Sequence, residues 1–151
     1  MTNDGGCAAI KETGLEIKRI NDRVSVSPQI VPEDIAAIKA AGFTTIVNNR
    51  PDGEAPDQPA GSEIEAAASA AGLAYVFIPM GRDGVSPDMI EQTRAALEGS
   101  EGPVFCYCRS GTRSATLWAL SQAGRQDATE IVSAAANAGY DLSHLIGHLG
   151  R

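Results

Sequence analysis

Residues 103–120 constrain the fold and function of this 151-residue chain more than any other stretch. The stretch begins with the apolar run Pro-Val-Phe-Cys-Tyr, which is typical of a buried strand, and continues through Cys108 into a helix that starts near Arg113. Backbone N–H groups of the loop, the positive end of the helix dipole and a guanidinium would then face one thiol. Such a loop binds an anion and favours the thiolate, so the sequence predicts a catalytic cysteine loop.

Overall charge and composition argue against several classes of function. The formal net charge of −7 disfavours nucleic acid or an anionic membrane surface as a partner. No apolar stretch is long enough to span a bilayer, and the N-terminus lacks the basic start and apolar run of a signal peptide. We therefore expect a cytoplasmic protein, with residues 1–15 as a loose lead-in and residues 16–151 as a single domain. The sequence leaves the oligomeric state open.

The cysteines and histidines give no sign of a disulfide framework or a metal site. The three cysteines are Cys7, Cys106 and Cys108. Their odd number, and the position of the last two on one face of a strand, favour a reducing compartment. Cys106 is expected to be a buried core residue. His144 and His148 are four residues apart on a possible helix, but no third ligand is nearby, so neither a metal nor another cofactor is expected.

Strand-like and helix-like segments alternate up to the cysteine loop, and only helices follow it. Strands are expected at residues 23–27, 43–48, 73–80 and 103–107. N-cap residues are expected at Ser62 (in a capping box), Ser86, Asp127 and Ser143. This order predicts an α/β fold with a central, mostly parallel sheet of about four to five strands, helices on both faces and an all-helical C-terminal part.

In a parallel sheet of this kind, the functional site lies at the carboxyl ends of the strands. Three loops leave those ends, at residues 49–61, 81–86 and 108–112. The polar residues that these loops place within reach of Cys108 are Asn49, Arg50, Asp52, Glu54, Arg82 and Asp83.

Two motifs resemble those of the cysteine-dependent protein tyrosine and dual-specificity phosphatases. Cys108-Arg-Ser-Gly-Thr-Arg-Ser114 resembles their phosphate loop, and Tyr75-Val-Phe-Ile-Pro-Met-Gly-Arg-Asp83 is similar to the stretch that carries their general-acid aspartate. Together with Asn48-Asn-Arg-Pro-Asp-Gly-Glu54 and the helical tail, they resemble one bacterial family, the phosphatase-like domain of beta-lactamase hydrolase-like proteins, over roughly residues 20–145. The resemblance implies a protein tyrosine phosphatase-like fold.

The resemblance also implies a role for each residue of the site. Cys108 would attack phosphorus as a thiolate and form a thiophosphate ester, which water then cleaves. Arg113 would bind two phosphate oxygens, Ser114 would help the thiolate to leave, and Asp83 would protonate the departing alkoxide. The anion cradle would consist of Arg109, Ser110, Gly111, Thr112 and Arg113. Supporting roles are expected for Arg50, Asp52 and Tyr107, and the alternative general acids are Asp52, Glu54 and Asp88.

Two departures from the phosphatase pattern leave a second interpretation open. Four residues separate Cys108 from Arg113, where the phosphatases have five, and Tyr107 takes the place of a histidine. A loop of this length resembles that of rhodanese sulfurtransferases, which carry a persulfide, although the helices at residues 125–149 favour the phosphatase architecture. We therefore expect a small-molecule or protein substrate that carries either a phosphate or a transferable sulfur. A non-catalytic anion-binding module is the third alternative.

Overall fold

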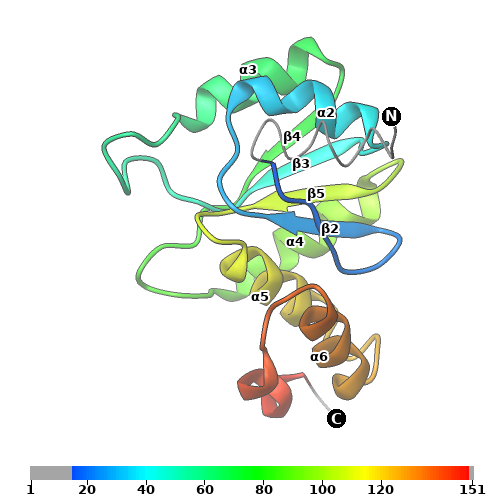
Figure 1. The fold of residues 1–151 in the computed structure, drawn as a ribbon. Helices are drawn as coiled ribbons and strands as arrows, with labels where there is room; N and C mark the ends of the chain where they lie inside the picture. Colours follow the sequence, from blue (N-terminus) through cyan, green and yellow to red (C-terminus); the bar gives the residue numbers. More distant parts are fainter. Residues whose placement is uncertain (1–14, 150–151) are drawn as a thin grey trace.

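A central five-stranded sheet in the order β1-β2-β5-β3-β4 organises the protein, as seen in a computed structural model that describes residues 15–149 (Figure 1). The strands are β1 (Lys18–Arg19), β2 (Val24–Ser27), β3 (Thr45–Asn48), β4 (Ala74–Phe77) and β5 (Val104–Tyr107). β2, β5, β3 and β4 run parallel to their neighbours, and β1 joins β2 in the antiparallel direction. The predicted mostly parallel α/β sheet is confirmed.

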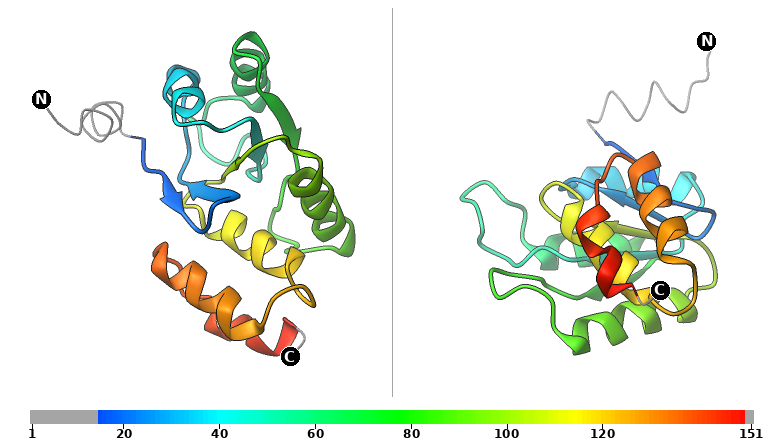
Figure 2. Two further views of the ribbon diagram at one scale, coloured as in Figure 1. Left: turned by 90° about the vertical axis from the view of Figure 1, so that its right-hand side faces the viewer. Right: turned by 90° about the horizontal axis from the view of Figure 1, so that it is seen from below.

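Helices cover both faces of this sheet, and two more helical segments extend the structure on one side (Figures 1 and 2). The helical segments are η1 (Pro32–Asp34), α2 (Ile35–Ala40), α3 (Gly61–Ala70), α4 (Pro87–Gly99), α5 (Thr112–Ser121), α6 (Ala128–Asn137) and η2 (Ser143–His148). η1, α2 and α3 pack on one face, whereas α4 and α5 pack on the other. α6 and η2 pack beyond α5, which gives the all-helical C-terminal part that the sequence predicts.

β5 is the central strand and is buried on both faces. Phe105 and Tyr107 point into the core under α2 and α3, and Phe105 meets Phe43 edge to face with ring centroids 5.3 Å apart. Val104 and Cys106 point into the other core, since successive side chains of a strand face opposite ways. A strand covered on both faces has to be apolar throughout, which explains the unbroken apolar run before Cys108.

The helix starts agree with the sequence only in part. Ser86 is the N-cap of α4 as predicted, because its hydroxyl oxygen accepts the N–H of Met89 at 3.2 Å. The capping box at Ser62 is wrong: α3 begins at Gly61, and Asp52 accepts the Gly61 N–H at 2.7 Å. The cap comes from nine residues upstream, so a local pattern cannot reveal it. Asp127 is the N-cap residue of α6 without a side-chain cap bond, and η2 already includes Ser143.

The two-residue strand β1 was not expected, because a strand this short carries no periodic signal. Residues 1–14 of the expected lead-in, Cys7 among them, lie outside the described residues. Between residues 15 and 149, the structure contains no helix with the length and apolar character needed to cross a membrane.

The C-terminal helices share a hydrophobic core with the sheet, and if the chain is a single domain the two parts should unfold together. Ile131 of α6 is fully buried in the cluster that includes Val104 and Trp118. We expect Ile131→Ala to lower the free energy of unfolding by about 2–5 kcal/mol and the chain to unfold in one transition, measured by urea titration with Trp118 fluorescence and circular dichroism. The exposed Ser133→Ala is the control and should change it by less than about 0.5 kcal/mol. Two separate transitions would contradict a single domain.

Candidate active site

Cys108 lies directly after β5, where the chain leaves the centre of the sheet and turns into α5. Its side chain is fully buried, and its Sγ accepts a hydrogen bond from the backbone N–H of Gly111 at 3.1 Å. The thiol therefore sits at the amino end of a helix, with a backbone donor aimed at the sulfur. Both features favour negative charge on the sulfur.

Gly111 allows the chain to make this turn. It has φ of +97°, in the left-handed region that glycine adopts without strain. A side chain would also meet Tyr140, because a Cβ at Gly111 would lie 2.1 Å from the Tyr140 hydroxyl oxygen. That hydroxyl donates to the carbonyl oxygen of Ser110 at 3.0 Å. The segment after α6 thus holds the cysteine loop, a contribution that no sequence signal indicated.

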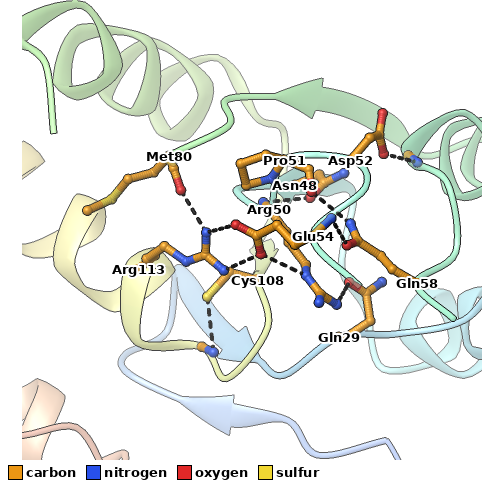
Figure 3. A network of polar contacts seen from close by, with 12 residues as sticks. Gln29, Asn48, Arg50, Pro51, Asp52, Glu54, Gln58, Met80, Cys108 and Arg113 are labelled. Atoms are coloured by element: carbon orange, nitrogen blue, oxygen red, sulfur yellow. Dashed lines mark hydrogen bonds and ion pairs between the residues drawn. The ribbon is translucent and has the colours of Figure 1, made fainter. Parts of the chain in front are cut away.

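The guanidinium of Arg113 is held from two other loops (Figure 3). Its Nη1 and Nη2 donate to Oε2 and Oε1 of Glu54 at 2.7 and 2.8 Å, a bidentate pair. Nη1 also donates to the carbonyl oxygen of Met80 at 2.7 Å. Hydrogen bonding to the Glu54 carboxylate, with a smaller contribution from the nearby Cys108 sulfur, raises the pKa of Arg113 above its usual value. The segments after β3 and β4 therefore meet the head of α5 at Arg113, which agrees with the predicted topology.

Arg50 is the second cation of this cluster and is almost entirely buried, with 5% of its side chain exposed. Its Nε donates to Oε1 of Glu54, and its Nη1 donates to Oε1 of Gln29, both at 3.0 Å. Gln29 follows β2, so each of the four parallel strands is followed by a residue of this cluster. The segment after β2 was not predicted to contribute, since its sequence carries no recognisable site motif. Arg113 first, and Arg50 to a smaller degree, lower the pKa of Glu54 from 4.5 to about 2. Glu54 is thus ionised at neutral pH.

Ser114 is linked to β3 rather than directly to the sulfur. Its buried hydroxyl donates to Oδ1 of Asn49 at 2.8 Å, and Nδ2 of Asn49 donates to the carbonyl oxygen of Ile78 at 2.9 Å. The backbone N–H of Asn49 donates to the carbonyl oxygen of Tyr107 at 2.8 Å, which continues the sheet past the strand ends. Asn49 therefore aligns the start of α5 with the neighbouring strands.

The other predicted residues lie around this centre. Tyr107 is buried on the α2–α3 face, where burial raises its pKa, and Asp52 caps α3. Asp83 is exposed in the turn that follows Met80. Arg109, Ser110 and Thr112 are exposed on the cysteine loop, Arg82 is exposed beside Asp83, and Asp88 is exposed in the first turn of α4. Among residues 15–149, no cluster of three or more metal-ligating side chains occurs.

Comparisons with known proteins extend these observations. A sequence model of a domain family, described as the phosphatase-like domain of beta-lactamase hydrolase-like protein, matches residues 16–125. A beta-lactamase hydrolase-like protein of Agrobacterium fabrum is 38% identical over 126 residues, which are 82% of this chain and 29% of that protein. One from Xylella fastidiosa is 35% identical over 91% of this chain and 32% of its own length. The chain spans about a third of the length of these curated relatives.

Solved structures agree with the fold. A candidate phosphatase of Neisseria meningitidis has a TM-score of 0.77 at 30% identity, with 88% of this chain and 95% of that chain covered. The Pseudomonas aeruginosa protein TpbA, solved with phosphotyrosine, has a TM-score of 0.62 at 16% identity, with 85% and 77% covered. At that identity, the second likeness shows the fold alone. The fold is that of protein tyrosine phosphatase-like proteins.

Substitution of Gly111 tests the contact between Tyr140 and the cysteine loop. We expect Gly111→Ala to destabilise the protein by more than Gly42→Ala, because Gly42 also has positive φ but no atom within 4 Å of its would-be Cβ. Gly42→Ala isolates the backbone strain of about 1–3 kcal/mol, and Gly111→Ala adds the displacement of Tyr140 and its hydrogen bond, about 1 kcal/mol more. Urea unfolding of both variants measures the difference. Equal losses would contradict the contact between Tyr140 and the loop.

The second test uses the low pKa of Glu54. Since its pKa falls from 4.5 to about 2 on folding, the carboxylate stabilises the fold fully above about pH 5, and this stabilisation is lost as the pH falls towards 2. We expect Glu54→Gln to lower the free energy of unfolding by about 1–2 kcal/mol at pH 7, and by less than half of that at pH 3. Urea titrations at both pH values, with the exposed Asp57→Asn as control, measure this. A loss that does not change with pH would contradict the ion pair.

Proposed function

Because this chain belongs to the phosphatase-like domain family of beta-lactamase hydrolase-like proteins, we propose that it is a cysteine-dependent hydrolase of phosphate monoesters. The position of Cys108 carries the proposal: its Sγ is 3.1 Å from the backbone nitrogen of Gly111, at the amino end of α5. Arg113 is close enough for the sulfur to affect its pKa. A thiol, one backbone donor aimed at it and a nearby guanidinium therefore support a nucleophilic anion-binding site at the head of α5.

In the first half of the proposed reaction, the Cys108 thiolate attacks phosphorus. A sulfur–phosphorus bond forms while the ester phosphorus–oxygen bond breaks, and the electron pair leaves with the alcohol oxygen. Asp83, in its protonated form, gives that oxygen a proton. Backbone N–H groups of residues 109–113 and the Arg113 guanidinium stabilise the charge on the equatorial phosphate oxygens. The product alcohol then leaves.

In the second half, water attacks the phosphorus of the thiophosphate. The Asp83 carboxylate takes a proton from the water, the sulfur–phosphorus bond breaks, and the electron pair returns to the Cys108 sulfur. Inorganic phosphate is released and Asp83 is protonated again. Ser114 keeps α5 aligned with β3 through its 2.8 Å bond to Asn49, so that the helix end stays directed at the leaving sulfur.

Asp83 is the preferred general acid because Asp52 and Glu54 are already engaged in other contacts. Asp52 accepts the backbone N–H of Gly61 at 2.7 Å and so closes the start of α3. Glu54 has a pKa of about 2, too low to donate a proton at neutral pH. The turn that carries Asp83 begins just after Met80, whose carbonyl oxygen accepts from Arg113 at 2.7 Å. This contact supports a position of Asp83 above the site.

Sulfane-sulfur transfer is the second candidate, and the four-residue loop between Cys108 and Arg113 favours it. A shorter loop suits a smaller group, and the Cys108 side chain is fully buried. The Cys108 thiolate would attack the outer sulfur of thiosulfate, the sulfur–sulfur bond would break, and sulfite would leave with the electron pair. The resulting persulfide would pass its outer sulfur to a nucleophile such as cyanide, which regenerates the thiolate.

Two assays on the same preparations test both candidates. We expect hydrolysis of para-nitrophenyl phosphate by the wild type, a loss of at least about a thousandfold in Cys108→Ser, and near-normal rates in the control Cys106→Ala. Cys106 is buried on the same chain segment but points into the core. Thiocyanate formed from thiosulfate and cyanide, with one sulfur atom added to Cys108 by mass spectrometry, would replace the phosphatase proposal with sulfur transfer. Neither activity, with a melting temperature raised by phosphate, would indicate a binding module.

A further inference from the structure

One carboxylate oxygen of Glu54 contacts both arginines of the site. Its Oε1 lies 3.0 Å from Nε of Arg50 and 2.8 Å from Nη2 of Arg113 (Figure 3). This oxygen marks a place, next to the cysteine loop, where a single anionic oxygen is bound by two guanidinium groups. An oxygen of a bound phosphate can take the same place, because guanidinium groups bind carboxylate and phosphate oxygens in the same bidentate geometry.

The two arginines are held more firmly than the carboxylate between them. Arg50 is buried, and its backbone N–H donates to Oδ1 of Asn48 at the end of β3. Arg113 belongs to the first turn of α5. Glu54 lies in the 49–61 loop, which extends from the body of the protein (Figures 1 and 2).

Apart from its carboxylate, the contacts of Glu54 are with neighbours in that loop. Its backbone N–H donates to Oε1 of Gln58 at 2.9 Å, and Nε2 of Gln58 donates to the carbonyl oxygen of Pro51 at 2.8 Å. These bonds stabilise the loop internally without fixing it to the sheet. Of the three charged groups, Glu54 is therefore the one that can move away while the others stay.

The charges of the site favour replacement of the Glu54 carboxylate by a bound phosphate. Arg50 and Arg113 carry two positive charges, of which Glu54 neutralises one. A phosphate dianion that bound beside an unmoved Glu54 would be repelled by its carboxylate in a partly desolvated site, whereas a dianion that replaced it would neutralise both cations.

We propose that Glu54 is an internal ligand of the anion site, that phosphate displaces it, and that Arg50 then becomes a second phosphate-binding arginine beside Arg113. The identity of the anion rests on the proposed function. Arg50 would act on the bound ligand directly, and Glu54 would act as a built-in competitor that lowers the affinity for free phosphate.

Calorimetric titration with inorganic phosphate at pH 7 tests the exchange. We expect Glu54→Gln to bind phosphate about tenfold or more tightly than the wild type, because the competing carboxylate is gone. Asp57→Asn is the matched control: it removes one negative charge from an exposed position on the same loop and should bind like the wild type. Affinity in Glu54→Gln that is no higher than in Asp57→Asn would overturn the proposal, and a lower one would show that Glu54 positions Arg113 instead.

The role of Arg50 is tested in the Glu54→Gln background, where removing Arg50 leaves no carboxylate without its partner. Adding Arg50→Gln should lose the tenfold gain, whereas adding Arg50→Lys should keep part of it. Circular dichroism confirms that each variant is folded. Unchanged phosphate affinity in the double variant Glu54→Gln, Arg50→Gln would rule out Arg50 as a contact.

Failure of this inference differs from failure of the proposed function, because binding is measured without turnover. Tighter phosphate binding in Glu54→Gln with no hydrolysis of aryl phosphate would support the exchange at Glu54 and contradict the proposed phosphatase activity. Hydrolysis by the wild type without any change in phosphate affinity in Glu54→Gln would support the phosphatase and contradict the exchange.

Discussion

The buried positive charge of Arg50 is the constraint on which this edge of the sheet depends. A guanidinium with 5% of its side chain exposed needs hydrogen-bond acceptors, because a buried charge without partners is strongly unfavourable. Glu54 pairs with it and, with the same carboxylate, also binds Arg113. One residue therefore connects the loop after β3 to the head of α5. The Met80 carbonyl adds the loop after β4 through Arg113.

A second constraint joins the cysteine loop to the C-terminal helices. Gly111 lets the chain turn sharply enough for its N–H to reach the sulfur of Cys108. The hydroxyl of Tyr140 fills the space beside Gly111 and binds the carbonyl of Ser110. The C-terminal segment that contains Tyr140 therefore helps to hold the backbone that faces the thiol.

The sequence predicted what depends on local patterns and missed what depends on long-range pairing. The order of strands and helices, the buried strand before Cys108 and the cap at Ser86 follow from hydrophobic period and residue preference. The links from Glu54 to two arginines and from Tyr140 to Ser110 join residues far apart in the chain, and no local pattern encodes them. Topology still placed Arg50, Glu54 and Arg113 at one edge, because the ends of parallel strands must meet there.

The short loop between Cys108 and Arg113 suggests a role for the second arginine, Arg50. With four residues between Cys108 and Arg113, the cradle offers one backbone N–H fewer than the phosphatase pattern, so a phosphate dianion would lack a donor there. Arg50, placed beside Arg113, could supply that donor once Glu54 has left, and the short loop would then be compatible with phosphate. A persulfide carries a single negative charge on a terminal sulfur, and the backbone donors and one arginine suffice for it. Glu54 would then keep its ion pairs with both arginines, so its displacement is expected with bound phosphate and not with a persulfide.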